Sequence, residues 1–191
     1  MEQTDNAPVW RTLARRTLAR RTLHRTPWLQ LVQDDTLNAA GKPEVYDHVL
    51  VPPSVTVLAH DTDRDLFAVT RQWIYTHGGT QWRLPGGGTD GVGVAPYRSV
   101  AEKELREETG VTADTWTWLG KVHGADSVSN HVDWVWLASG LSSGSPELED
   151  GEADLVVLWL PFNQLRDLVL AGEMPHAGST YAVLRYAATR R

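Results

Sequence analysis

Hydrophobic and polar residues alternate over short stretches along most of the chain after residue 27, which is the pattern of half-buried β-strands. Two such stretches, Ser54–Ala59 and Leu66–Trp73, flank the charged segment Asp61–Asp65 and predict a β-hairpin. The same pattern predicts six further strands, at Trp28–Val32, Glu44–Val51, Trp82–Leu84, Trp116–Val122, His131–Ala138 and Leu155–Leu160.

Three segments carry the start signals of helices, a proline or a serine at the first position. They are Pro96–Thr109, Pro161–Ala171 and Ser179–Thr189, and the first two are followed by Gly110 and Gly172. Many strands with three helices predict one α/β (α+β) domain, and 191 residues are enough chain for a single core.

The N-terminal part differs, because Arg11–Arg25 consists of three five-residue repeats, RTLAR, RTLAR and RTLHR. On a helix, successive leucines of this repeat would each lie about 140° further round, so that no apolar stripe forms. We therefore expect residues 1–26 to be a solvated, flexible and partly helical basic arm, and residues 27–191 to be the folded domain. A role for the arm in binding phosphate or nucleic acid is the alternative.

Composition narrows the kinds of site that the chain can hold. The chain has no cysteine, which excludes disulfides, zinc–thiolate sites and thiol catalysis, so that a metal would need oxygen or imidazole ligands. The net charge is −6 although the first 28 residues contain six arginines, so the body of the chain is acidic and ill suited to general nucleic-acid binding. With no long apolar run, we expect a soluble cytoplasmic protein that does not enter a membrane.

The most informative segment is Leu84–Val111, in which a glycine-rich turn precedes a helix with three acidic residues. Glu104, Glu107 and Glu108 are spaced i, i+3, i+4, which places their carboxylates on one helix face. Their repulsion is relieved if a divalent cation lies among the oxygens, and Gly86-Gly87-Gly88 lets the backbone approach a ligand closely. Taken alone, such a charged run is usually only a solvated helix face.

The order and spacing of these residues resemble the Nudix box, G-x5-E-x7-R-E-U-x-E-E-x-G-U with U apolar. Residues 103–111 match its second half, with Lys103 at the arginine position. The first half is about one residue longer, and Val94 and Ala95 occupy the candidate positions of its glutamate. Segments at Thr70–Trp73, Trp82–Gly87 and Leu158–Leu165 are similar to the ADP-ribose pyrophosphatase group of that family.

The resemblance implies a Nudix-type α/β/α sandwich with a mixed sheet, a homodimer formed with the help of N-terminal strands, and Mg²⁺ or Mn²⁺ as cofactor. It implies a small nucleotide substrate, ADP-ribose or a nucleotide sugar, whose pyrophosphate bond is hydrolysed to release a nucleoside monophosphate. The expected metal ligands are Gly86, Glu104, Glu107 and Glu108. The expected catalytic residues are Glu107, Glu108 and a loop acid, for which we choose Glu152 ahead of Glu149. The expected substrate contacts are Arg71, Arg83, Gly87 and Gly88.

Three alternatives stay open on the sequence. The chain could be a nucleoside triphosphate pyrophosphohydrolase, or a nucleotide-binding regulatory module with weak activity, which the missing glutamate and Lys103 favour. It could also be an RNA-end hydrolase guided by the basic arm, which would show strongly salt-dependent binding. Histidines His123, His131 and His176 are expected near the site, in packing or hydrogen-bonding roles rather than as metal ligands.

Overall fold

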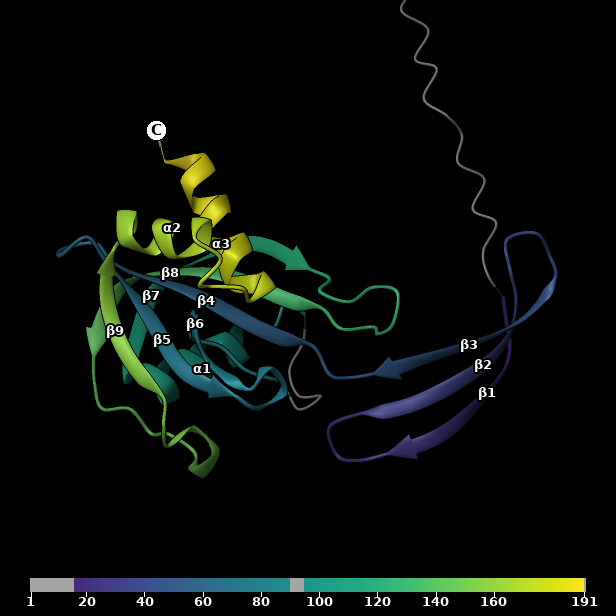
Figure 1. Ribbon diagram of the computed structural model, residues 1–191. Helices are drawn as coiled ribbons and strands as arrows, with labels where there is room; N and C mark the ends of the chain where they lie inside the picture. The colour runs from purple at the N-terminus through teal and green to yellow at the C-terminus, as the bar shows by residue number, and fades with distance from the viewer. Residues whose placement is uncertain (1–15, 90–94, 191) are drawn as a thin grey trace, which may run out of the picture. The chain divides into compact units, whose positions relative to one another are not determined.

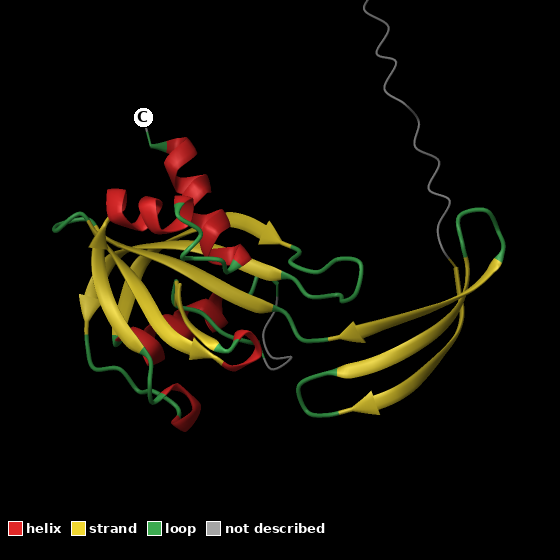
Figure 2. Cartoon of the chain, in the orientation of Figure 1, coloured by secondary structure: helices red, strands yellow, loops and turns green. Residues whose placement is uncertain are grey.

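The computed structural model describes residues 16–89 and 95–190 (Figures 1 and 2). They divide into two compact units. One contains the described residues up to Leu50 together with Ser127–Ser129, and the other contains the described residues of 51–126 and 130–190.

The first unit is a three-stranded antiparallel sheet in the order β1-β2-β3. Its strands are β1 (Arg16–Arg25), β2 (Gln30–Leu37) and β3 (Pro43–Leu50). Arg20 of β1 lies directly opposite Asp34 of β2 and donates two hydrogen bonds of 2.7 Å to its carboxylate. This guanidinium, together with His48, lowers the pKa of the buried Asp34 carboxyl to about 2. The pair therefore fixes the register of β1 against β2.

The expectation of partly helical structure is wrong for residues 16–25, which form β1. The reason is a long-range interaction: Arg20 and Arg21 pair with Asp34 and Asp35 of the next strand. The repeat sequence alone does not indicate that these partners exist. The division between the compact units also lies at 50/51 rather than at 26/27. The first repeat, Arg11–Arg15, lies outside the described residues.

The second unit is built on a six-stranded mixed sheet with the path β6-β5-β4-β8-β7, to which β9 adds by pairing with β5. Its central pair, β4 (Ser54–Asp61) and β8 (Asp133–Ser143), is parallel, and the other pairings are antiparallel. The remaining strands are β5 (Leu66–Ile74), β6 (Gly79–Arg83), β7 (Val111–Val122) and β9 (Val156–Pro161). The predicted α/β fold with a mixed sheet is confirmed.

Helices cover both faces of this sheet, with α1 (Arg98–Thr109) on one side and α2 (Phe162–Leu170) and α3 (Ala177–Thr189) on the other (Figure 1). Alternate residues of β4 therefore enter different cores. Val55 and Val57 pack with Leu105 of α1, whereas Leu58 packs with Val183 of α3. Two short 3-10 helices, Tyr75–His77 and Asp150–Glu152, complete the elements.

The predicted strands and helices are present, but several begin or end at other residues than predicted. The second strand runs to Leu37 instead of Val32, and the strand predicted from Trp116 begins at Val111, directly after the helix. The hairpin of β4 and β5 forms, but the two strands pair only next to their turn, at His60–Phe67 and Asp61–Leu66. Over residues 16–89 and 95–190, no helix has the length and apolar character needed to cross a membrane.

Candidate functional site: three carboxylates beside a glycine segment and a half-buried arginine

The short pairing of β4 with β5 creates the place for the site. Before His60, β4 is not paired with β5, and the segment from Pro85 to Thr89 bonds to this free edge instead. The N–H of Val57 donates to the carbonyl of Pro85 (2.8 Å), and the N–H of Val55 donates to the carbonyl of Gly87 (2.9 Å). The glycine segment is thus held in an extended form against the middle of the sheet.

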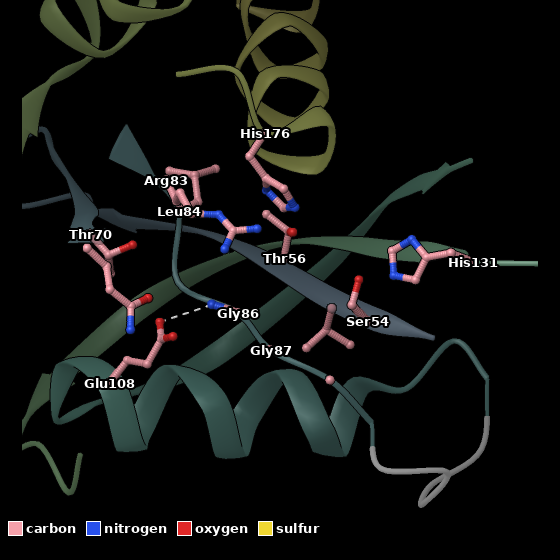
Figure 3. A pocket seen from close by; sticks show the side chains of 13 residues that line it. Ser54, Thr56, Thr70, Arg83, Leu84, Gly86, Gly87, Glu108, His131 and His176 are labelled. Carbon is pink, nitrogen blue, oxygen red and sulfur yellow. Dashed lines mark hydrogen bonds between the residues drawn. The ribbon is translucent and has the colours of Figure 1, made fainter. Parts of the chain in front are cut away.

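A pocket of about 260 Å³ lies next to this segment (Figure 3). Its walls come from β4, β5, the end of β6, the glycine segment, α1 and the start of α3. This volume is below the range of about 300–1,000 Å³ typical of sites for whole drug-sized ligands. The pocket therefore suits a compact group, such as the phosphates of a nucleotide, rather than a complete nucleotide.

Helix α1 presents two of its acidic residues to this region and buries them. Ala101 and Leu105 are fully buried in the core, and the neighbouring Glu104 and Glu108 are only 9% and 5% exposed. The helix begins at Arg98 and ends at Gly110, which adopts the left-handed conformation (φ 71°). The predicted common face of these two carboxylates is therefore a buried face, not a solvated one.

Two glycines allow the backbone to reach these carboxylates. The N–H of Gly86 donates to Oε2 of Glu108 at 3.0 Å, as the dashed line in Figure 3 shows. Gly86 has φ 156°, and a Cβ there would collide with the backbone of Val55. A Cβ on Gly87 would collide with the carboxylate of Glu104. Both positions therefore require glycine, since only glycine allows this approach.

Glu152, at the end of the 3-10 helix after β8, completes a cluster of three carboxylates. One oxygen each of Glu104, Glu108 and Glu152 lies within 4.8 Å of the others. The loop that carries Glu152 is fastened to α1, because the N–H of Glu147 donates to the carbonyl of Glu107 (2.8 Å) and Arg106 donates to the Glu147 carboxylate (2.7 Å). Glu152, the residue chosen from the sequence as the loop acid, lies in the same cluster as the two helix residues.

Burial changes the acidity of the cluster. Desolvation, with repulsion from the neighbouring carboxylates, raises the pKa of Glu104 to about 7 and that of Glu108 to about 8. The hydrogen bond from Gly86 opposes the shift of Glu108 and only partly offsets it. Carboxylates that are costly to ionise without a counter-charge are the donors that a hard divalent cation stabilises. The residues present therefore fit a Mg²⁺- or Mn²⁺-type ion.

Glu107 lies apart from this cluster. Its carboxylate forms ion pairs with Lys103 (2.8 Å) and Arg106 (3.0 Å). Lys103 also comes within 3.7 Å of Glu104. The structure thus connects Glu107 with the cations of its own helix, while Glu104, Glu108 and Glu152 come together.

Three of the four residues expected to contact the substrate line the pocket, and the fourth does not. Arg83, Gly87 and Gly88 line the pocket. Arg71 does not, because its neighbours Thr70 and Gln72 on β5 face the pocket and successive strand residues point to opposite sides. The exposed Arg71 guanidinium lies instead over the ring of Trp82, 5.4 Å from its centre.

The histidines separate as well. His131 and His176 line the pocket, whereas His123 is exposed. The Nδ1 atom of His176 lies 2.9 Å from Oγ of Ser179, and that oxygen accepts a hydrogen bond from the N–H of Leu84 (2.9 Å). This chain of contacts ties the start of α3 to the residue between Arg83 and the glycine segment.

Sequence reasoning missed Asp133, at the start of β8. It is 3% exposed, accepts a hydrogen bond from Thr56 (2.7 Å) and lies 3.8 Å from Nε2 of His176. Burial raises the pKa of its carboxyl. An acidic residue at the start of an apolar strand was the available signal. Of the two candidate positions for the missing glutamate, Val94 lies outside the described residues and Ala95 precedes α1 in a turn.

Known proteins resemble this chain in sequence and in fold. The profile of the NUDIX domain matches residues 50–182. A similar protein is the ADP-ribose pyrophosphatase of Mycobacterium tuberculosis, 34% identical over 142 residues, which are 74% of this chain and 66% of that protein. The chain therefore spans just under two thirds of that relative's length. Among solved structures, an ADP compounds hydrolase is similar in fold, with a TM-score of 0.75, 21% identity, and coverage of 91% of this chain and 92% of that chain.

Proposed function

Because the chain belongs to the Nudix family, we propose that it is a metal-dependent hydrolase of nucleoside diphosphates linked to another group. It cleaves the pyrophosphate bond of ADP-ribose or of a nucleotide sugar and releases a nucleoside monophosphate. The observation that carries this proposal is the convergence of Glu104, Glu108 and Glu152 beside a pocket that holds a half-buried arginine. The similarity to a protein named ADP-ribose pyrophosphatase supports the substrate class.

In this proposal Glu104, Glu108, Glu152 and the carbonyl of Gly86 hold Mg²⁺ or Mn²⁺. The carbonyls on either side of Gly86, those of Pro85 and Gly87, accept hydrogen bonds from β4. In an extended segment the carbonyl between them points the other way, toward α1. A bound divalent cation would supply positive charge that stabilises the phosphoryl oxygens as the bond breaks.

The chain's own groups orient the reactants. Glu152 is partly exposed at the edge of the cluster, where solvent water can reach it, and we assign it as the base that accepts a proton from that water. A bond forms between the water oxygen and phosphorus, the bond from phosphorus to the bridging oxygen breaks, and the leaving phosphate keeps that electron pair. The backbone of Gly87 and Gly88 lines the pocket and would border the phosphates, and Glu107 forms ion pairs with Lys103 and Arg106 on the same helix.

The test is hydrolysis by the full chain of a panel containing ADP-ribose, nucleotide sugars, dinucleotides and nucleoside triphosphates, with Mg²⁺ or Mn²⁺. We expect turnover of the diphosphate-linked substrates and its loss in Glu108→Gln. Glu102→Gln is the matched control, because Glu102 is an exposed residue of the same helix, paired with Arg98 (2.7 Å). Turnover of triphosphates alone would replace the proposed substrate class. Tight nucleotide binding without any turnover, unaffected by Glu108→Gln, would replace the enzyme with a binding module.

We also propose that the first unit forms a homodimer contact. Large apolar side chains are exposed on it: Leu18, Leu23, Trp28, Leu29 and Val45. A three-stranded sheet with such residues in solvent needs a covering partner, and a second copy of the chain offers the same surface. Light scattering after gel filtration should give twice the chain mass for the wild type and the single chain mass for Leu18→Asp with Leu23→Asp. A monomeric wild type would rule the dimer out.

A further inference from the structure

The pocket has a second charged end, opposite the carboxylate cluster, formed by Arg83 of β6. The Arg83 guanidinium points into the pocket above Thr56 (Figure 3). Burial lowers the pKa of this guanidinium, and the charges of Glu108 and Asp133 oppose that shift. Within residues 16–89 and 95–190, however, no carboxylate lies within 4 Å of it and it donates no hydrogen bond. A half-buried, desolvated cation without an ion-pair partner is costly to the free protein, and a bound anion would remove that cost.

His176 supplies a hydrogen-bond donor beside Arg83. Its Nδ1 atom is occupied by the Ser179 hydroxyl and by the Ser179 N–H at 3.4 Å, which caps the start of α3. Burial and the neighbouring Arg83 lower the pKa of this imidazole to about 3, so that the ring is neutral. With Nδ1 as acceptor, the ring hydrogen resides on Nε2. Nε2 lies 3.8 Å from Asp133, beyond hydrogen-bond distance, and is available to a ligand oxygen.

We propose that Arg83 and His176 form an anion subsite that binds the second phosphoryl group of a diphosphate, while the carboxylate cluster serves the first. The glycine segment lies between the two ends, and the pocket volume of about 260 Å³ accommodates phosphates rather than a base or a sugar. The planar guanidinium can donate two parallel hydrogen bonds to phosphoryl oxygens, and the His176 N–H adds a third from another element.

A purely structural role for Arg83, as counter-ion of Glu108 and Asp133, fits the geometry less well. Neither carboxylate is within ion-pair distance of it among the described residues. Burial also raises the pKa of both carboxyl groups, and the attraction of Arg83, which opposes that rise, is too small to offset it. The subsite rests on the proposed function for its biological substrate, but it predicts affinity for any compact diphosphate, including inorganic pyrophosphate. A monophosphate engages only one end of the pocket and binds more weakly.

The experiment is calorimetric titration of the full chain with inorganic pyrophosphate in EDTA, at fixed ionic strength and neutral pH. We expect measurable binding that weakens by about tenfold or more in Arg83→Gln, as the loss of charge-assisted hydrogen bonds implies. Arg83→Lys should restore part of the affinity. His176→Asn keeps a side chain that can cap α3 but removes the Nε2 donor, and should weaken binding severalfold. Inorganic phosphate should bind more weakly than pyrophosphate in the wild type.

Arg166→Gln is the control for a change in overall charge, because Arg166 is an exposed residue of α2 that pairs with Asp167. Equal affinity in Arg83→Gln and the wild type, an equal loss in Arg166→Gln, or no binding of pyrophosphate by the wild type would each overturn the subsite. Measuring pyrophosphate binding and nucleotide hydrolysis separately distinguishes the failure of one proposal from the failure of the other. Pyrophosphate binding that depends on Arg83 in a chain that hydrolyses none of the nucleotides would keep the subsite and refute the proposed function.

Discussion

Glu108, on a helix, and Glu152, in the loop that follows β8, bring carboxylate oxygens to within 4.8 Å of each other. The two residues reach this distance through different supports. Glu108 is fixed by the packing of α1 and by the Gly86 N–H, and Glu152 by a loop whose Glu147 is bonded to Arg106 and to the backbone of Glu107. The helix thus holds two of the carboxylates directly and anchors the loop that delivers the third.

Replacing Glu152 tests this arrangement. We expect Glu152→Gln to lower kcat by about 10²–10⁴-fold, the usual contribution of a general base, and to weaken Mg²⁺ binding as well. Asp150→Asn removes one charge from the same 3-10 helix and should leave kcat close to the wild-type value. Steady-state kinetics over a range of Mg²⁺ concentrations measures both effects. Equal losses in the two variants would show that only the loop's net charge matters.

Gly110 connects the helix to the same loop. A Cβ on this residue would lie 2.6 Å from the carbonyl carbon of Ser145 and 2.7 Å from the nitrogen of Pro146, and its φ of 71° disfavours other residues. Because strain and a backbone collision add, Gly110→Ala should lower the free energy of unfolding by roughly 3 kcal/mol or more. The loop should also shift, which reduces turnover further.

Gly172 provides the matched comparison for Gly110. It has a similar φ of 75° after α2, but a Cβ there meets nothing within 4 Å. Gly172→Ala should therefore cost only the left-handed strain of about 1–2 kcal/mol and leave turnover intact. Urea denaturation of both variants measures the difference, and equal destabilisation would remove the argued contact between Gly110 and the loop.

The sequence predicted the strands, the helices and the acidic helix face well, because those features depend on local periodicity and on stop signals such as Gly110. The burial of Glu104 and Glu108 was not visible locally, since it depends on the glycine segment that packs over them. The same holds for Arg71, whose position on β5 places it outside the pocket although it lies next to two pocket residues in sequence.

Long-range pairing explains the remaining differences. The conformation of Arg16–Arg25 is decided by Asp34 and Asp35 on another strand, so the five-residue period carried no information about it. Asp133, at the start of β8, lies 3.8 Å from the pocket residue His176 and belongs to no motif with a recognisable spacing.

The raised pKa values predict how the metal-free protein responds to pH. A carboxyl whose folded-state pKa lies above its unfolded value stabilises the fold at low pH, and this contribution is lost as pH rises through the folded pKa. For Glu104 and Glu108 those values are about 7 and about 8. His176, with a pKa of about 3, acts in the opposite direction only below its ordinary value of 6.5.

In EDTA, the Tm should therefore fall as pH rises from about 6.5 to 9, in the window where His176 is neutral in both states. Glu108→Gln should flatten this decline, and Mg²⁺ should reverse it, because the cation binds the ionised carboxylates and releases protons. Thermal denaturation at several pH values, with and without Mg²⁺, makes the measurement. A Tm that is constant or rises over this range in EDTA would contradict the burial of these carboxylates.

Arg83 should carry a cost in stability that matches its role in binding. The desolvated guanidinium has no ion-pair partner among the described residues, so that Arg83→Met, which fills similar space without charge, should raise the free energy of unfolding of the free protein. We expect a gain of about 1–2 kcal/mol near pH 6. The gain should shrink toward pH 9, because Glu108, with a pKa of about 8, is then ionised and attracts the wild-type arginine.

Urea denaturation at both pH values measures the gain in the free energy of unfolding. Added pyrophosphate should stabilise the wild type but not Arg83→Met. A variant less stable than the wild type at pH 6 would show instead that Arg83 supports the fold, and the anion subsite would lose its energetic basis.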